Sequence, residues 1–354
     1  MTGAELALVE EVLASNYLND GEVTERFERE IARLLGVRHA VAVTSGTSAI
    51  FLSLAALGVG PGDEVIVPDV TFIATANAVS LTGARPVLVD IDPRSLNISP
   101  EAFERAITAR TKAVVPVHVS GRGNNLPQVL EIARSRGLFV VEDAAEAFMS
   151  SIAGGYLGTF GDTGCFSFSP NKTITTGQGG IIVTNDDRLH VRLRELKDQG
   201  RPVRGTGGDD LHHSIGYNFK LTNLQAAVGI GQLTELGSRL QRQRDIHLGY
   251  LEGLAELPGL RFPGFQLAQG ETPQWTDVLV DRRDELDGYL AARGVQCRRF
   301  WHPVHTQAPY QLEDSDFPNS TAVAPHALWL PSAFTLTDEV VSEVSRLIRD
   351  FLVP

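Results

Sequence analysis

Lysine is scarce in this sequence, which narrows the search for a reactive amine. Four of the 31 basic residues are lysines, namely Lys112, Lys172, Lys197 and Lys220. Lys172 lies in a loop between two apolar segments, with Ser167 before it and a glycine-rich turn at 177–180 after it. A lysine that its neighbours desolvate in such a loop can form a Schiff base with an aldehyde. Lys112 precedes a predicted strand and Lys197 sits in a charged helix, so we expect both to be solvated.

An acidic residue is predicted at the end of a buried strand. Residues 138–141 form an apolar strand that runs directly into Glu142 and Asp143, and Glu146 follows. Because an unpaired buried carboxylate is costly, Asp143 should face a cation or a hydrogen-bond donor. The alternative, that Asp143 caps the following turn, stays open at this point.

A helix that starts with small residues is the third feature. The segment Thr44-Ser45-Gly46-Thr47-Ser48 leads into a predicted helix at 48–57. Free N–H groups and hydroxyls at a helix start favour an anion such as a phosphate, although the same residues also make an ordinary N-cap. Phosphate donors, a strand-end acid and a lysine together match the binding needs of pyridoxal 5'-phosphate (PLP). Phe72 could stack on its ring or belong to the core.

The elements around these residues alternate in a regular way. From about residue 38, short apolar segments alternate with amphipathic ones, which is typical of βα units. Because near-continuous apolar strands are buried on both faces, we expect an α/β fold with a mostly parallel central sheet, whose ligands bind beyond the carboxyl ends of the strands. The predicted strands are 40–43, 64–67, 86–89, 113–117 and 138–141, and the predicted helices include 24–36, 48–57 and 71–81.

A length of 354 residues suggests a large domain with a smaller companion. We expect a large PLP-binding α/β domain with an N-terminal helical segment over residues 1–235. A small C-terminal α+β domain is expected over residues 236–354. One long helix that starts after about Gln225 is expected to form the hinge between them.

Composition limits the partners and the setting. Acidic side chains outnumber basic ones by 43 to 31, and the net charge of −12 argues against a nucleic-acid or anionic-membrane partner. Two cysteines, Cys165 and Cys297, are too few for a disulfide framework or a cysteine-built metal site, so we expect no metal and a cytoplasmic location. No stretch approaches the roughly 20 apolar residues that span a bilayer.

Five motifs, in order, resemble one enzyme family over nearly the whole chain. The sequence is similar to the sugar aminotransferases of the DegT/DnrJ/EryC1/StrS family, which have the fold type I (aspartate aminotransferase-like) architecture. Residues 142–146 and Asn171-Lys172 look most like the GDP-perosamine synthases, and the segment 119–125 is similar to an aminotransferase of 8-amino-octulosonate formation. The motifs are Thr44-Ser-Gly-Thr47, Pro68-Asp-Val-Thr-Phe72 with 74–77, Glu142-Asp143-Ala-Ala-Glu146, Ser167 with Lys172 and 177–180, and Gly216-Tyr-Asn218 with 219–227.

The resemblance implies a role for each matching residue around PLP. Lys172 would form the Schiff base and then act as the acid and base of the proton shift. Asp143 would pair with the ring nitrogen, Glu146 would lie near the ring hydroxyl, and Phe72 would stack on the ring. The phosphate would be held by Gly46, Thr47, Ser48 and Ser167.

The same resemblance implies partners and substrates. Asn218 would reach the phosphate from the other subunit, so a homodimer with shared active sites is expected. His212 and His305 fall where the family often contacts sugar or nucleotide, while a role as ordinary polar loop residues is equally open for both. The expected reaction transfers an amino group from L-glutamate to a nucleotide-linked keto-deoxysugar.

Three rival functions are considered. Family relatives that dehydrate sugars carry His in place of the lysine, so Lys172 argues against that reaction. The acceptor could instead be an octulosonate or a keto-inositol, which the sequence does not decide. A regulatory protein that binds PLP without turnover is disfavoured by the intact set of Lys172, Asp143 and Ser167.

Overall fold

A seven-stranded sheet forms the centre of the computed structural model, which describes residues 3–202 and 210–353. The strand order is β1-β9-β8-β5-β4-β2-β3. The pairs from β8 through β3 are parallel, and β9 pairs antiparallel with both β1 and β8, which confirms the expected mostly parallel sheet. The strands are β1 (His39–Val43), β2 (Glu64–Pro68), β3 (Arg85–Val89), β4 (Thr111–Val114), β5 (Phe139–Asp143), β8 (Thr163–Ser167) and β9 (Gly180–Thr184).

Side chains alternate along these strands between two hydrophobic cores. In β1, Ala42 belongs to the core that contains Phe27, whereas Val43 belongs to the core that contains Leu52. One face is covered by α2 (Glu22–Leu35), α5 (Pro100–Ala106), α6 (Leu126–Arg136) and α8 (Asn223–Leu233). The other is covered by α3 (Gly46–Ala56), α4 (Ala74–Leu81) and α7 (Asp187–Lys197), and α1 (Gly3–Ser15) packs on α8.

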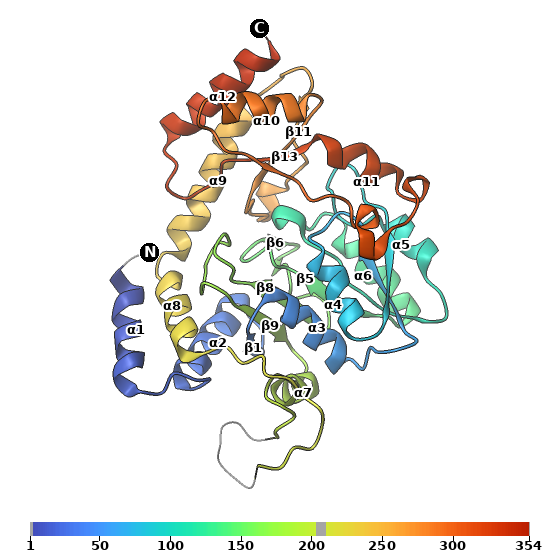
Figure 1. The fold of residues 1–354 in the computed structure, drawn as a ribbon, viewed down its shortest axis with the longest axis vertical. Helices are drawn as coiled ribbons and strands as arrows, with labels where there is room; N and C mark the ends of the chain where they lie inside the picture. The colour runs from blue at the N-terminus through green and yellow to red at the C-terminus, as the bar shows by residue number, and fades with distance from the viewer. Residues whose placement is uncertain (1–2, 203–209, 354) are drawn as a thin grey trace.

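A second, four-stranded sheet lies at the far end of α9 (Leu236–Gly253), where α10 and α12 pack beside it (Figure 1). Its order is β10-β11-β13-β12, with antiparallel pairing throughout. The division into two domains at residues 235 and 236 remains a prediction. The remaining elements are β6 (Ser151–Ile152), β7 (Gly155–Tyr156), β10 (Leu260–Arg261), β11 (Thr276–Val280), α10 (Arg283–Ala291), β12 (Arg298–Arg299), α11 (Pro318–Val323), β13 (Ala327–Leu330) and α12 (Asp338–Leu352).

The single long helix expected after Gln225 is wrong, because the chain breaks there into α8 and α9. The Thr234 backbone N–H and hydroxyl both donate to the carbonyl of Gly231, at 3.2 and 2.7 Å. Glu235 has φ −103° and ψ 9°, outside the helical region. The helix therefore ends at Leu233, and α9 begins at Leu236. No helix within the described residues is long and apolar enough to cross a membrane.

Lys197 is buried, which corrects the expectation of a solvated side chain. Its ammonium lies 3.1 Å from a carboxylate oxygen of Glu28 and 3.2 Å from one of Asp20, and its side chain is 2% exposed. It also donates to the carbonyl of Ala42 in β1. Burial raises the pKa of Glu28, but the charges of Lys197 and Arg194 outweigh it, so the net pKa is lowered. This cluster joins α2, β1 and α7.

Replacing Lys197 by Met should lower the free energy of unfolding by about 3–5 kcal/mol, because two carboxylates then lose a buried cation. Urea unfolding of the full chain measures the change. Lys112→Met is the matched control, since the Lys112 side chain is 34% exposed where it pairs with Asp63. It should cost less than about 1 kcal/mol. Equal losses in the two variants would contradict the burial of Lys197.

The lowered pKa of Glu28 determines the direction in which the free energy of unfolding should change with pH. A carboxylate whose pKa is lower in the folded state adds stability above its unfolded pKa, and that stability is lost as the pH falls through the folded value. The wild-type unfolding free energy should therefore fall as the pH drops below 4.5, the ordinary pKa of a glutamate, and Lys197→Met should flatten this slope. Identical slopes in the two proteins would argue against the coupling.

Candidate active site

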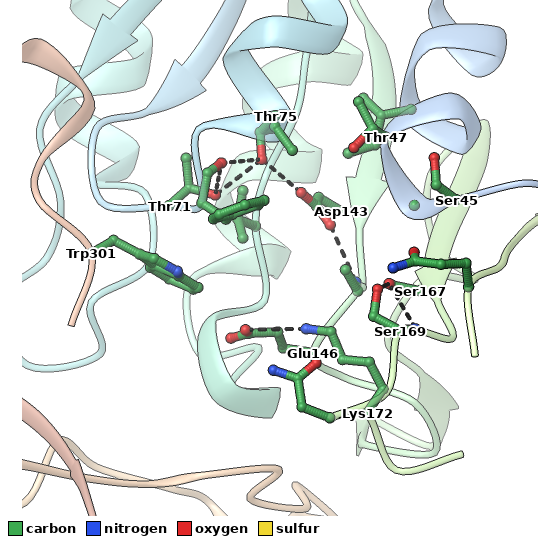
Figure 2. A pocket seen from close by; sticks show the side chains of 18 of the residues that line it. Ser45, Thr47, Thr71, Thr75, Asp143, Glu146, Ser167, Ser169, Lys172 and Trp301 are labelled. Atoms are coloured by element: carbon green, nitrogen blue, oxygen red, sulfur yellow. Dashed lines mark hydrogen bonds and ion pairs between the residues drawn. The ribbon is translucent and has the colours of Figure 1, made fainter. Parts of the chain in front are cut away.

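A cavity of about 350 Å³ opens beyond the carboxyl ends of β5 and β8 and collects most of the predicted site residues. Small residues at the start of α3 form one wall, and Trp301 lies on another side (Figure 2). Phe72 also borders the cavity. The expected position of the ligand site in a parallel sheet is thus where the cavity lies. Its lining includes Gly46, Thr47, Phe72, Thr75, Asp143, Glu146, Ser167, Lys172, Arg298 and Trp301.

Lys172 reaches this cavity from the loop between β8 and β9. Its ammonium lies 3.3 Å from Oε1 of Glu146, and its side chain is 13% exposed. The Lys172 backbone N–H donates to the carbonyl of Ser169, which holds the loop in a turn. The amine therefore points inward beside a carboxylate, as Figure 2 shows.

Asp143 is the last residue of β5 and meets both expectations made for it. Its Oδ1 accepts from the backbone N–H of Ala145 at 3.2 Å, so it does cap the following turn. Its Oδ2 accepts from the hydroxyl of Thr75 at 2.7 Å and borders the cavity. Burial raises the pKa of Asp143, while the Thr75 hydroxyl and the Lys172 charge oppose the rise. A cation inside the cavity would offset that cost further.

The start of α3 divides its residues between two tasks. Ser45 accepts from the Ser48 N–H, and the Ser48 hydroxyl contacts the Ser45 N–H and carbonyl at 3.0 and 2.8 Å, which is a capping box. The Ser48 side chain is thereby engaged within the cap. Gly46 and Thr47 border the cavity together with Ser167. Their N–H groups lie in the first turn, which has no intrahelical partners, so they suit an anion.

The close contact between the start of α3 and β9 requires a glycine at position 180, the first residue of β9. A Cβ on Gly180 would lie 2.4 Å from the carbonyl carbon of Ser45, so a side chain there cannot be accommodated without moving the helix start. A Cβ on Gly46 would come within 3.1 Å of the Cβ of Ser167. Backbone donors, a buried carboxylate and an inward amine thus surround one cavity. This donor set fits PLP, which carries a phosphate, a ring nitrogen and an aldehyde.

Thr75 and Trp301 are among the cavity residues that the sequence did not indicate. Thr75 was quoted within a motif without a role, although its spacing from Phe72 places it on the next turn at the start of α4. Trp301 comes from the segment after β12, and its sequence neighbours gave no signal of this placement. Phe72 is 54% exposed, so it lies on the cavity wall rather than in the core.

Four predicted residues lie outside this cavity, namely Ser48, whose hydroxyl serves the helix cap, and Asn218, His212 and His305. The Asn218 side chain accepts from Lys220 at 2.9 Å, and His212 contacts the carbonyl of Gln199 at 2.8 Å. The His305 side chain is fully buried, with Nδ1 2.6 Å from Asp69 and Nε2 3.1 Å from Asp314. His305 therefore ties two loops together in this chain and does not border the cavity.

The fold and this cavity define a class, the fold type I PLP-dependent enzymes, in which a loop lysine and a strand-end aspartate face each other across the cofactor site. Residues 1–349 match the model of the DegT/DnrJ/EryC1/StrS aminotransferase family. The chain belongs to that family and is a PLP-dependent aminotransferase.

Individual relatives agree with this assignment. The chain is 38% identical to the GDP-perosamine synthase of Escherichia coli O157:H7, over 99% of this chain and 96% of the relative. It superposes on DesV of S. venezuelae with a TM-score of 0.93 and 35% identity, covering 99% of this chain and 94% of DesV. DesI, solved in the presence of its TDP-sugar product, gives a TM-score of 0.90 and 32% identity, covering 98% and 89%.

Thr75→Val should weaken PLP binding about tenfold, because a hydrogen bond to a charged group contributes roughly 1.5–3 kcal/mol and its loss lets Asp143 take up a proton. Equilibrium dialysis of the cofactor measures the affinity. Thr71→Val is the matched control, since Thr71 contacts the Thr75 hydroxyl at 3.0 Å and borders the same cavity. If both variants bind PLP like the wild type, Thr75 does not support Asp143.

Proposed function

We propose that this aminotransferase moves the amino group of L-glutamate onto the keto carbon of a nucleotide-linked deoxysugar. The observation that carries the proposal is the placement of the Lys172 amine beside Glu146 in one cavity with Asp143. The relatives support the acceptor class, since one is named for GDP-perosamine and another was solved with a TDP-sugar.

Each cavity residue contributes a defined step. When bound, PLP supplies an aldehyde that condenses with amines and a ring that accepts electrons. The Lys172 Nζ takes the proton from the donor carbon and returns one to the acceptor carbon, which is general acid–base catalysis. Asp143 holds a proton on the ring nitrogen, and Gly46 and Thr47 bind the phosphate with backbone N–H groups. Phe72 and Trp301 exclude water from the reacting atoms.

The proposal includes the location and the assembly. Cys165 and Cys297 are both free, which suits a reducing cytoplasm. A homodimer with shared sites would give Asn218 a role, because this side chain does not border the cavity of its own chain. His212 is proposed to contact the substrate from the same loop region. The proposed contact of His305 with substrate has weaker support, since its ring is buried between two carboxylates.

Lys172→Ala should lose turnover by a factor of at least about 10³, since a positioned acid–base group contributes roughly 10²–10⁴ and the covalent attachment is lost as well. The measurement is release of 2-oxoglutarate from glutamate with each keto-sugar nucleotide. Lys112→Ala, which changes a surface lysine, should retain wild-type rates. Turnover in Lys172→Ala would refute the assignment.

A spectroscopic titration separates the rival functions. Glutamate should bleach the visible band of the bound cofactor, and a keto-sugar nucleotide should restore it. If a keto-inositol or an octulosonate restores the band and a sugar nucleotide does not, the acceptor belongs to that other class. A band that glutamate leaves unchanged would point to a PLP-binding regulator.

Mixing two inactive variants tests the shared site. If Asn218 serves the partner's cavity, then dimers formed between Lys172→Ala and Asn218→Ala chains contain one site with both native residues. Activity should therefore return on mixing, up to about one quarter of the wild-type sites when chains exchange at random. Light scattering checks the dimer mass. Absence of recovery in a verified mixed dimer would place Asn218 on its own chain's site or on none.

A further inference from the structure

Glu146 uses both of its carboxylate oxygens. Oε1 faces the Lys172 ammonium at 3.3 Å, and Oε2 accepts from the backbone N–H of Ser120 at 3.1 Å. Ser120 is fully buried and does not border the cavity. A residue behind the cavity wall thus fixes the orientation of the carboxylate that faces the reactive amine.

The backbone of Ser120 has an unusual conformation. Its φ of 54° and ψ of 14° lie in the left-handed region, which residues other than glycine adopt only where the surroundings enforce it. Its hydroxyl donates to Oδ1 of Asp277 at 2.8 Å, and its carbonyl accepts from the Gln274 N–H at 2.9 Å. Trp329 donates to the same hydroxyl at 3.3 Å. All three partners belong to the segment that builds the second sheet.

The anchor of this arrangement is a buried ion pair. Asp277, in β11, pairs with the guanidinium of Arg122, and both side chains are 0% exposed. Arg122 also donates from Nε to the carbonyl of Ser95 at 2.7 Å and lies 4.6 Å from the ring centre of Phe265. Because these contacts leave neither side chain free to rotate, the Ser120 hydroxyl has a fixed acceptor.

We propose that Ser120 is a positioning residue that links the Arg122–Asp277 ion pair to Glu146 and holds this carboxylate against the Lys172 amine. The proposal rests on the proposed role of Lys172. A fixed carboxylate stabilises positive charge next to it in the cavity. The other charged groups that face this site are Asp143 on β5, Asp277 on β11 and Arg298 at the cavity rim.

Ser120→Ala tests the link in the PLP-loaded enzyme. The pH at which the visible cofactor band changes should fall by about one unit, because a loosened carboxylate stabilises positive charge less. With glutamate and a keto-sugar nucleotide, kcat should fall about tenfold while KM changes less than about threefold. An unchanged midpoint would overturn the proposal.

Ser150→Ala is the matched control. The Ser150 hydroxyl donates to the carbonyl of Gly121 at 2.6 Å and accepts from the Thr272 N–H at 3.0 Å, so it bridges the same two segments. Its contacts do not include Glu146 or Asp277. Ser150→Ala should lower the melting temperature and leave the midpoint of the band in place. A shift as large as that of Ser120→Ala would show a merely structural effect and overturn the proposal.

A double variant that leaves the net charge unchanged tests the same link in a second way. Arg122→Met with Asp277→Leu removes the anchor of Ser120 and takes out the buried cation together with its ion-pair partner. It should lower the midpoint in the same direction, and adding Ser120→Ala should cause no further shift, since both act through one contact. Additive shifts would contradict the link.

The visible band of the bound cofactor is measured without an amino donor or acceptor. The shifts of its pH midpoint can therefore be observed even if no keto-sugar nucleotide is a substrate, and that result would contradict only the proposed function. Absence of the band in the wild type would overturn both.

Discussion

The organisation of the site depends on one buried carboxylate. Asp143 ends β5 in a position where burial raises its pKa, and the hydroxyl of Thr75 and the N–H of Ala145 compensate only part of that cost. A protonated heterocycle bound in the cavity would supply the missing positive charge. Asp143 and such a ligand would then satisfy each other electrostatically, and the parallel sheet holds Asp143 in place at its edge. Under the proposed function, the Lys172 loop and the start of α3 would contact the other ends of the same ring.

The walls of the cavity come from chain segments that are far apart in the sequence. Gly46, Phe72 and Asp143 belong to the seven-stranded part, whereas Arg298 lies in β12 of the four-stranded sheet and Trp301 follows that strand. Under the proposed function, the first group would face the cofactor and the second group would face the acceptor. Discrimination between acceptors is therefore expected to depend on Arg298 and Trp301 more than on the first group.

Local sequence signals were sufficient for the strands of the central sheet and for several residues that line the cavity. The apolar strands and the small residues before α3 lie within a few residues of the features that they predict. The scarcity of lysine left few candidates for the reactive amine. The failures share a cause, which is tertiary contact over long separations. The burial of Lys197 depends on Glu28 and Asp20, and that of His305 depends on Asp69. Trp301 reaches the cavity from the loop after β12, where it packs against Trp329 of β13.

The close approach of Gly180 to Ser45 has a consequence for how such enzymes can diversify. Because Gly180 has room for a hydrogen atom and nothing larger, the beginning of β9 and the first turn of α3 cannot move independently, although Gly46 and Gly180 are 134 positions apart in the sequence. Any side chain at Gly180 would displace the start of α3, so the anion pocket cannot be altered gradually from this side. New acceptor preferences would therefore arise at the opposite rim, where side chains meet solvent and can vary in size without displacing the phosphate.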